Sequence, residues 1–259
     1  MYKSIASWIL IIAPNFVMAS TGSSAHFFSG DDQQFDIVGE AFSLKDQRLI
    51  YREFHRVDGN HHVVIYRDPK GNEFSRKTLD FSASDQAPSF KQYNRWSDET
   101  IAADNIKGGI SLSYRNNRKN IDSTETLMTN NNLIIDAGFN RYITNNWQSL
   151  TNGQAAVFDF ALADRQDLIA LEIEQSDCQK IPATKSSLNN KPEKTSHNTV
   201  CFSIGADNRL IRWLIGSLNL VYAKDTQQLL RFIGLGNIND QQGKGLKVDI
   251  HYHYPPKKR

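Results

Sequence analysis

Short segments of alternating polar and apolar residues, separated by turn signals, dominate this sequence and indicate a β-rich fold. The first four lie at residues 35–44, 48–57, 61–67 and 73–81. Asp58-Gly59-Asn60 suits a tight hairpin because Asp-Gly readily takes positive φ, and Asp68-Pro69-Lys70-Gly71 matches a type I turn. We therefore expect these segments to form an antiparallel meander.

The same pattern continues to the end of the chain. Strands at a spacing of roughly ten residues are typical of antiparallel sandwiches and barrels. We expect a mainly β fold, with a curved antiparallel sheet that forms a barrel or half-barrel, in a single domain over residues 35–254. The further predicted strands are 89–96, 110–115, 121–128, 133–135, 154–162, 168–175, 199–204, 219–223, 228–233 and 246–254.

One amphipathic helix is predicted at residues 136–150, between two groups of strands. Asp136 is a suitable N-cap, because its carboxylate can accept from free N–H groups of the first turn. Large apolar side chains follow at helical spacing and share one face. A helix this short needs a packing partner, so the sheet is expected to wrap around it. The apolar face consists of Phe139, Tyr142, Ile143, Trp147 and Leu150, and a possible second short helix lies at residues 208–217.

The N-terminus has the three-part pattern of a secretory signal peptide. Lys3 precedes an apolar core at residues 5–13, and small residues end at Ala19. The apolar run before Pro14 is about half the length that a membrane-spanning helix needs, roughly 20 residues. We predict cleavage after Ala19, or after Ala25, and a periplasmic location. Residues 20–34 are then a flexible lead-in.

Two cysteines, Cys178 and Cys201, follow in the exported chain. An even number of cysteines in an oxidising compartment favours a disulfide. The bridge would close a polar loop at residues 179–198. The alternative is two free thiols, and Cys178 would then be a candidate nucleophile.

Composition excludes several classes of function. The net charge is +2, with 30 basic and 28 acidic side chains, which gives no electrostatic surface for nucleic acid. The basic tail at residues 255–259 is too short for strong membrane attraction. Glycines at residues 234–245 precede a strand where a phosphate loop would need a helix, and no motif indicates a cofactor.

Histidines and charged residues supply two weaker candidate sites. His251 and His253 lie two apart on a predicted strand and could share a metal with His61 or His62, but no third ligand is fixed, so we predict no metal site. A polar cluster is expected around the second strand, where it could bind an acidic headgroup or serve acid–base chemistry; its alternative is an ordinary solvated sheet face. Its members are Glu53, His55, Arg67 and Arg76, with Arg52 and Lys77 nearby.

Several segments resemble those of a group of uncharacterised exported proteobacterial proteins. They lie at residues 49–55, 66–71, 76–81, 136–139 and 235–240. That resemblance implies export but no activity. The expected architecture is also loosely similar to the periplasmic lipoprotein carriers, in which a curved antiparallel sheet wraps around helices and shelters acyl chains.

These observations favour a soluble periplasmic protein that binds a lipid-like or hydrophobic ligand in the concave face of the sheet. Phe139, Tyr142, Ile143 and Trp147 are the expected lining residues. The first alternative is an envelope assembly or scaffold protein that acts through protein–protein contacts. The second is a hydrolase that uses Glu53 and His55, although the sequence favours a protein without catalytic activity.

Overall fold

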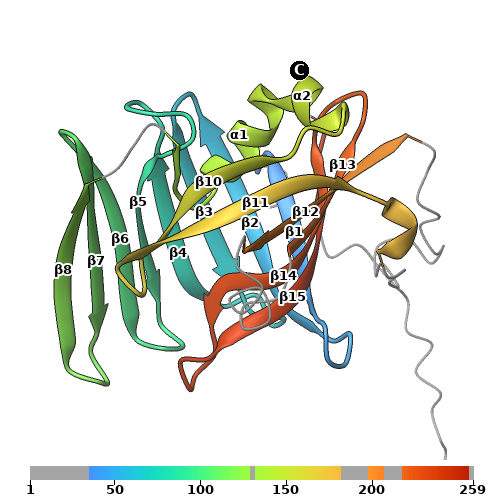
Figure 1. The fold of residues 1–259 in the computed structure, drawn as a ribbon. Coiled ribbons are helices and arrows are strands. Elements are labelled where there is room, and N and C mark those ends of the chain that lie inside the picture. Colours follow the sequence, from blue (N-terminus) through green and yellow to red (C-terminus); the bar gives the residue numbers. More distant parts are fainter. Residues whose placement is uncertain (1–34, 129–131, 182–197, 207–217, 257–259) are drawn as a thin grey trace, which may run out of the picture.

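The computed structural model describes residues 35–128, 132–181, 198–206 and 218–256 (Figure 1). Within these residues, fifteen strands form one large sheet whose two end strands do not pair, so the fold is mainly β and the barrel-like prediction is confirmed. The strands are β1 (Ile37–Ser43), β2 (Leu49–Asp58), β3 (His61–Arg67), β4 (Glu73–Asp80), β5 (Ser89–Asn94), β6 (Glu99–Ile106), β7 (Gly109–Asn116), β8 (Ile121–Met128), β9 (Leu133–Ile134), β10 (Ala156–Leu162), β11 (Asp167–Ser176), β12 (Thr199–Ala206), β13 (Leu218–Ala223), β14 (Leu229–Asn239) and β15 (Gly245–His253).

The strand order shows how the chain builds the sheet. The order is β8-β7-β6-β5-β4-β3-β2-β1-β15-β14-β13-β12-β11-β10-β9, so consecutive strands pair with each other except β8 and β9, which form the two ends of the sheet. β1 and β15 pair although they are far apart in sequence. Every pairing is antiparallel apart from that of β9 with β10. We call β2 to β8 the N-terminal arm and β9 to β15 the C-terminal arm, with β1 between them.

Two strands differ from the sequence prediction. β6 was missed, because Glu99–Ile106 contains two alanines, an aspartate and an asparagine, which have low β propensity. β14 runs on to Asn239 instead of ending at residue 233. Its glycines suit close packing: a Cβ on Gly234 would lie 2.4 Å from Leu218 Cδ2. The predicted helix at residues 208–217 and the signal peptide lie outside the described residues.

The predicted helix at residues 136–150 exists but is divided into α1 (Gly138–Asn145) and α2 (Trp147–Thr151), with a break at Asn146. Asp136 does not cap it. The N-cap residue is Ala137, and no side chain caps the helix. Asp136 has a positive φ of 44°, and its carboxylate instead pairs with a sheet lysine. A third short helical segment, η2 (Cys178–Lys180), follows β11.

Side-chain hydrogen bonds join parts of the sheet whose strands do not pair with each other. At the turn between β10 and β11, Gln166 donates to the Leu112 carbonyl at 2.9 Å and accepts from Ser123 at 2.7 Å, which fastens the C-terminal arm to β7 and β8. At the far end of β14, Gln92 and Asn94 each donate to a main-chain carbonyl at 2.9 Å. The unpaired sheet is therefore held in a rolled shape by hydrogen bonds across its interior.

The main hydrophobic core lies inside this shell. α1 and α2 pack there against the C-terminal arm, and Figure 1 shows both helices at one end of the shell beside β10 and β13. We call the sheet face that they cover the inner face. Aromatic contacts define it: Tyr142 packs on Phe158 at 5.4 Å between ring centroids, and Trp147 packs on Phe202 at 5.8 Å.

Candidate functional site

The inner face of the N-terminal arm carries a chain of polar side chains built from β2 and β3. Glu53 and His55 are two residues apart on β2, so both point to the same face. His55 Nε2 lies 3.1 Å from Glu53 Oε2, and His55 Nδ1 lies 3.2 Å from His62 Nε2. The side chains of Glu53 and His55 are only 5% and 13% exposed. A carboxylate and two imidazoles thus form one continuous hydrogen-bonded group, the Glu53–His55–His62 chain.

Tyrosines surround the carboxylate end of this chain. The Tyr252 hydroxyl of β15 donates to Glu53 Oε2 at 3.2 Å. Tyr51 and Tyr66 are fully or almost fully buried on the same inner face. Burial, and then the negative charge of Glu53, raise the pKa of all three phenols well above the usual value of 10, so these hydroxyls remain protonated donors.

His62, at the other end of the chain, is electrically neutral. Burial, followed by the nearby charges of His55 and Lys77, lowers the pKa of His62 to about 3. In the tautomers in which His55 Nε2–H donates to the Glu53 carboxylate and His55 Nδ1 is unprotonated, His55 Nδ1 accepts from His62 Nε2–H. His62 Nδ1 is then an acceptor, which suits a hydroxyl or amide donor.

A buried ion pair lies beside this chain and connects it to the helices. Lys77 Nζ on β4 donates to both carboxylate oxygens of Asp136 at 2.8 and 2.7 Å. The lysine side chain is 2% exposed and the aspartate 14%, so the charges are largely removed from water. The pair fastens the segment before α1 to the floor of the N-terminal arm.

Further contacts hold α1 between the two arms. On the N-terminal side, the Ile135 amide donates to the Gln86 carbonyl at 3.0 Å, and Arg141 pairs with Asp85. On the C-terminal side, the Tyr222 hydroxyl of β13 donates to Asn140 at 2.9 Å. α1 is therefore a bridge across the open end of the rolled sheet.

The four predicted lining residues on the helices all contact the inner core, but to different depths. Ile143 is completely buried and Tyr142 nearly so. Phe139 and Trp147 are partly buried and pack against the core from its margin. Phe139 lies 6.5 Å from Phe232 between ring centroids, and its remaining surface is accessible.

The predicted polar cluster is brought together only in part. Arg67 lies on the opposite, outer face, where its guanidinium is 4.8 Å from the centroid of Phe54. Arg76 is exposed, and its guanidinium donates two hydrogen bonds of 2.8 Å to the Glu73 carboxylate. Sheet alternation explains the result, because odd positions of β2 face inward with His62 while Arg76 and Arg67 project outward.

Two members of the site were not predicted as part of the polar cluster: Tyr252, and His62, which had been considered only as a possible metal ligand. Cross-strand neighbours follow from register, and the hairpin at Asp58-Gly59 does set the register that places His62 diagonally from His55. The position of Tyr252 beside Glu53 could not be predicted, because no local sequence signal indicates that β15 pairs with β1.

The histidines considered for a metal site do not all share one face of the sheet. His251 belongs to the outer face, within 3.2 Å of Asp249, whereas His62 is on the inner face. Burial alone would raise the pKa of Asp249, but hydrogen bonds from Arg231 and His251 outweigh it and lower the pKa to about 2. Among the described residues, no group of three or more potential metal ligands occurs.

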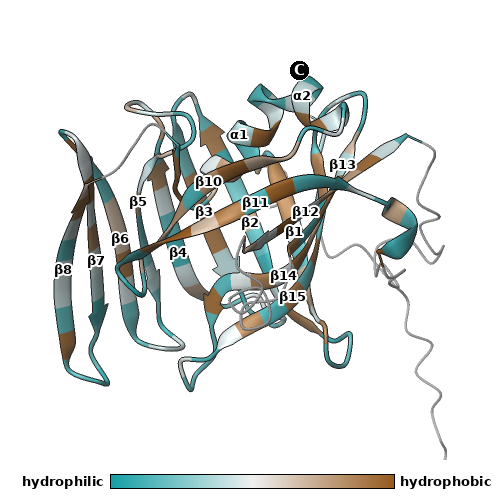
Figure 2. Ribbon diagram, viewed as in Figure 1, coloured by the Kyte–Doolittle hydropathy of each residue, from teal (hydrophilic) through white to brown (hydrophobic). Residues whose placement is uncertain are grey.

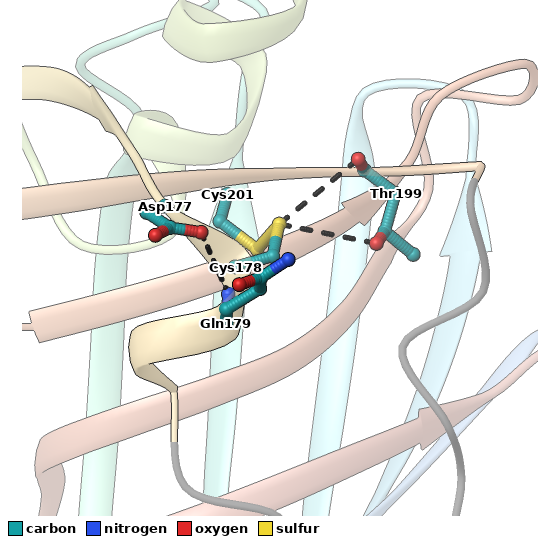
Figure 3. The surroundings of a disulfide bond; sticks show 5 residues. All are labelled: Asp177, Cys178, Gln179, Thr199 and Cys201. Atoms are coloured by element: carbon teal, nitrogen blue, oxygen red, sulfur yellow. Dashed lines mark hydrogen bonds between the residues drawn. A yellow bond between two sulfur atoms is a disulfide. The ribbon is translucent and has the colours of Figure 1, made fainter.

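The predicted disulfide is present and joins Cys178 in η2 to Cys201 on β12 (Figure 3). Cys201 is completely buried, and the Thr199 hydroxyl lies 3.9 Å from Cys178 Sγ. The bond fastens the chain after β11 to the neighbouring strand, on the opposite face from the aromatic core. Cys178 is therefore not a free nucleophile.

Comparisons with known proteins identify a similar fold without an assigned role. No protein-family model and no curated protein matches this chain. Among solved structures, it is similar to a β-barrel-like protein of a domain of unknown function, DUF1849, from Brucella abortus, with 12% sequence identity and a TM-score of 0.46. The match covers 84% of this chain and 99% of that chain. No helix in the described ranges is long and apolar enough to cross a bilayer.

Proposed function

We propose that the mature protein binds an amphiphilic, lipid-like molecule on the inner face of the rolled sheet. The observation that carries this proposal is that the inner face has a polar part and an aromatic part. The N-terminal arm presents the Glu53–His55–His62 chain, and the C-terminal arm with its helices presents half-buried aromatic rings. An amphiphile needs both kinds of surface, one beside the other.

The apolar part of the ligand would lie against the margin of the core. Phe139 and Trp147 keep part of their rings accessible while the rest is packed, so a ligand chain could remove further apolar area from water without moving the helices. Each square ångström so buried contributes about 25 cal/mol. α1 borders this region because it spans both arms.

The polar part of the ligand is expected to be uncharged. The charged side chains near His62 already compensate one another, since Lys77 pairs with Asp136 and Arg141 pairs with Asp85. A neutral His62 offers an acceptor and no positive charge. These groups suit a hydroxyl or amide headgroup better than a carboxylate or phosphate, which would require a free cation.

We also infer a periplasmic location, on the basis of the signal-peptide pattern that ends at Ala19. The Cys178–Cys201 disulfide supports this inference, because structural disulfides persist in oxidising compartments.

Ligand uptake by the purified mature protein tests the proposal. A monoacylglycerol with a fluorophore at its chain end should bind more tightly than the matching fatty acid. Phe139→Ser should weaken binding of both probes, whereas Val157→Ser, an exposed apolar residue on a neighbouring strand, should not. His62→Phe should remove the preference for the monoacylglycerol. Absence of binding, or equal losses in Phe139→Ser and Val157→Ser, would refute the proposal.

Acid–base catalysis is a second candidate function, favoured by the 3.1 Å contact between Glu53 and His55. A carboxylate that orients an imidazole is a recurrent arrangement for general-base catalysis, in which the imidazole removes a proton from the attacking water and returns it to the leaving alcohol of an ester. Incubation with a fluorogenic monoacylglycerol ester would distinguish the two. Release of product that is lost in Glu53→Gln supports catalysis, whereas retention of intact ligand supports binding alone.

A further inference from the structure

Strand β8 forms a long, regular edge of the described sheet, without the lysine, proline or bulge that often protects such an edge. It is the last strand of the sheet on the N-terminal side, and its eight residues pair with β7 without a register shift. Ile121–Met128 contains no lysine and no proline, and most of its side chains are exposed. Natural edge strands normally carry such residues, or a bulge, to prevent pairing with another chain.

The opposite edge of the sheet differs in length and in exposure. β9 has two residues, both buried. Directly after it, the Ile135 amide donates to the Gln86 carbonyl of the other arm. One edge is therefore short and covered, while the other offers a full strand of main-chain groups.

The composition of β8 suits pairing with itself. Residues that lie opposite each other in an antiparallel pair project to the same face of the sheet. When the two strands are identical and related by a two-fold axis, one residue must therefore lie opposite the same residue of the second copy. With Thr124 at the axis, Asp122 faces Thr126, Ser123 faces Glu125 and Ile121 faces Leu127 of the second copy. Each carboxylate then meets a hydroxyl, and the apolar ends of β8, visible in Figure 2, meet each other.

Neighbouring registers lack this complementarity. An axis at Glu125 would set two glutamates directly opposite, and like charges in that position repel. An axis at Ser123 would set Ile121 against Glu125. The register centred on Thr124 is therefore the one in which neither charges nor apolar side chains are mismatched.

We propose that two copies of this protein associate through antiparallel pairing of their β8 strands about a two-fold axis at Thr124. The two sheets then continue into each other. One strand pair covers less surface than a standard stable interface, so the dimer is reversible and forms at high concentration. Ligand binding on the inner face does not depend on this association.

Two substitutions of the same residue type on the same exposed strand test the register. Thr124→Lys sets two lysines directly opposite across the axis. Thr126→Lys sets each lysine opposite Asp122 of the second copy. Both threonines are exposed, so the folding of the two variants is comparable and can be verified by circular dichroism and melting temperature.

The dissociation constant of the dimer is measured by sedimentation equilibrium at protein concentrations from about 10 µM to 1 mM, a range suited to a weak, transient interface. The wild type should show a monomer–dimer equilibrium. Thr124→Lys should raise the dissociation constant at least tenfold, and Thr126→Lys should leave it unchanged or lower it. A wild-type monomer at every concentration overturns the proposal, as do equal effects of the two substitutions.

Discussion

The Lys77–Asp136 pair is the contact whose removal should most clearly release α1 from the sheet. Lys77→Met keeps the unbranched stem but leaves the Asp136 carboxylate without its partner at 14% exposure. Removing one member of a buried pair costs about 3–5 kcal/mol, and the residual exposure of Asp136 favours the lower value, about 3 kcal/mol. For a domain of this size, that corresponds to a melting temperature lower by about 6–12 °C.

A double-mutant cycle isolates the pair. Asp136→Asn is the suitable second substitution, because asparagine tolerates the positive φ of 44° at this position. Asp136→Asn alone leaves a lysine of 2% exposure unpaired and should cost at least as much as Lys77→Met. The double variant removes both charges and should recover all but about 1 kcal/mol of the free energy of unfolding.

Urea unfolding at neutral pH, followed by circular dichroism, supplies the four free energies of unfolding. Arg76→Met is the control, because the Arg76–Glu73 pair is exposed and its loss should change stability by less than about 1 kcal/mol. A cost below about 1 kcal/mol for Lys77→Met, or additive effects in the cycle, would show that this pair does not hold α1 in place.

Other perturbations probe the disulfide, the outer-face carboxylate and the helix junction. Cys178 and Cys201 are 23 positions apart, so on the chain-entropy model replacing both by serine should lower the free energy of unfolding by about 3 kcal/mol. An unchanged urea midpoint would contradict this. Asp249, with a folded pKa near 2 against about 3.9 unfolded, stabilises the protein above pH 4; this contribution of about 2 kcal/mol is lost as pH falls from 5 to 2. The stability difference between wild type and Asp249→Asn should shrink over that range, and a constant difference would exclude the Asp249–Arg231 contact as its source. Gly138→Ala would set a Cβ 2.0 Å from a main-chain carbonyl oxygen of the β4–β5 loop, so it should destabilise the protein measurably in thermal unfolding, and a neutral effect would mean that this junction is not closely packed.

Local signals in the sequence were sufficient for most strands and for the helical segment. The turn at Asp58-Gly59 and the alternation in residues 48–57 do give β2, β3 and the shared face of Glu53 and His55. β6 was missed because its alanines, Asp104 and Asn105 give no β signal, and the sheet on both sides imposes its conformation. Tertiary pairing outweighs intrinsic propensity there.

The candidate site depends on relations that local patterns do not contain. Asp136 looked like a helix cap because only its neighbours in sequence were visible, but its partner, Lys77, is 59 positions away. Tyr252 reaches Glu53 from 199 positions away, across the junction of the two arms. Such contacts follow from the order of strands in the sheet, and that order is fixed by the packing of the whole chain.

Paramagnetic broadening of Trp147 by a bound amphiphile is the most direct test of ligand binding on the inner face. The mature protein is labelled with fluorotryptophan, and its fluorine signals are assigned by single Trp→Phe substitutions. A monoacylglycerol with a nitroxide on its acyl chain should broaden the Trp147 signal, and reduction of the nitroxide by ascorbate should restore it. If the probe binds and the Trp147 signal keeps its width, or if no binding occurs, the proposed ligand does not lie against α1 and α2.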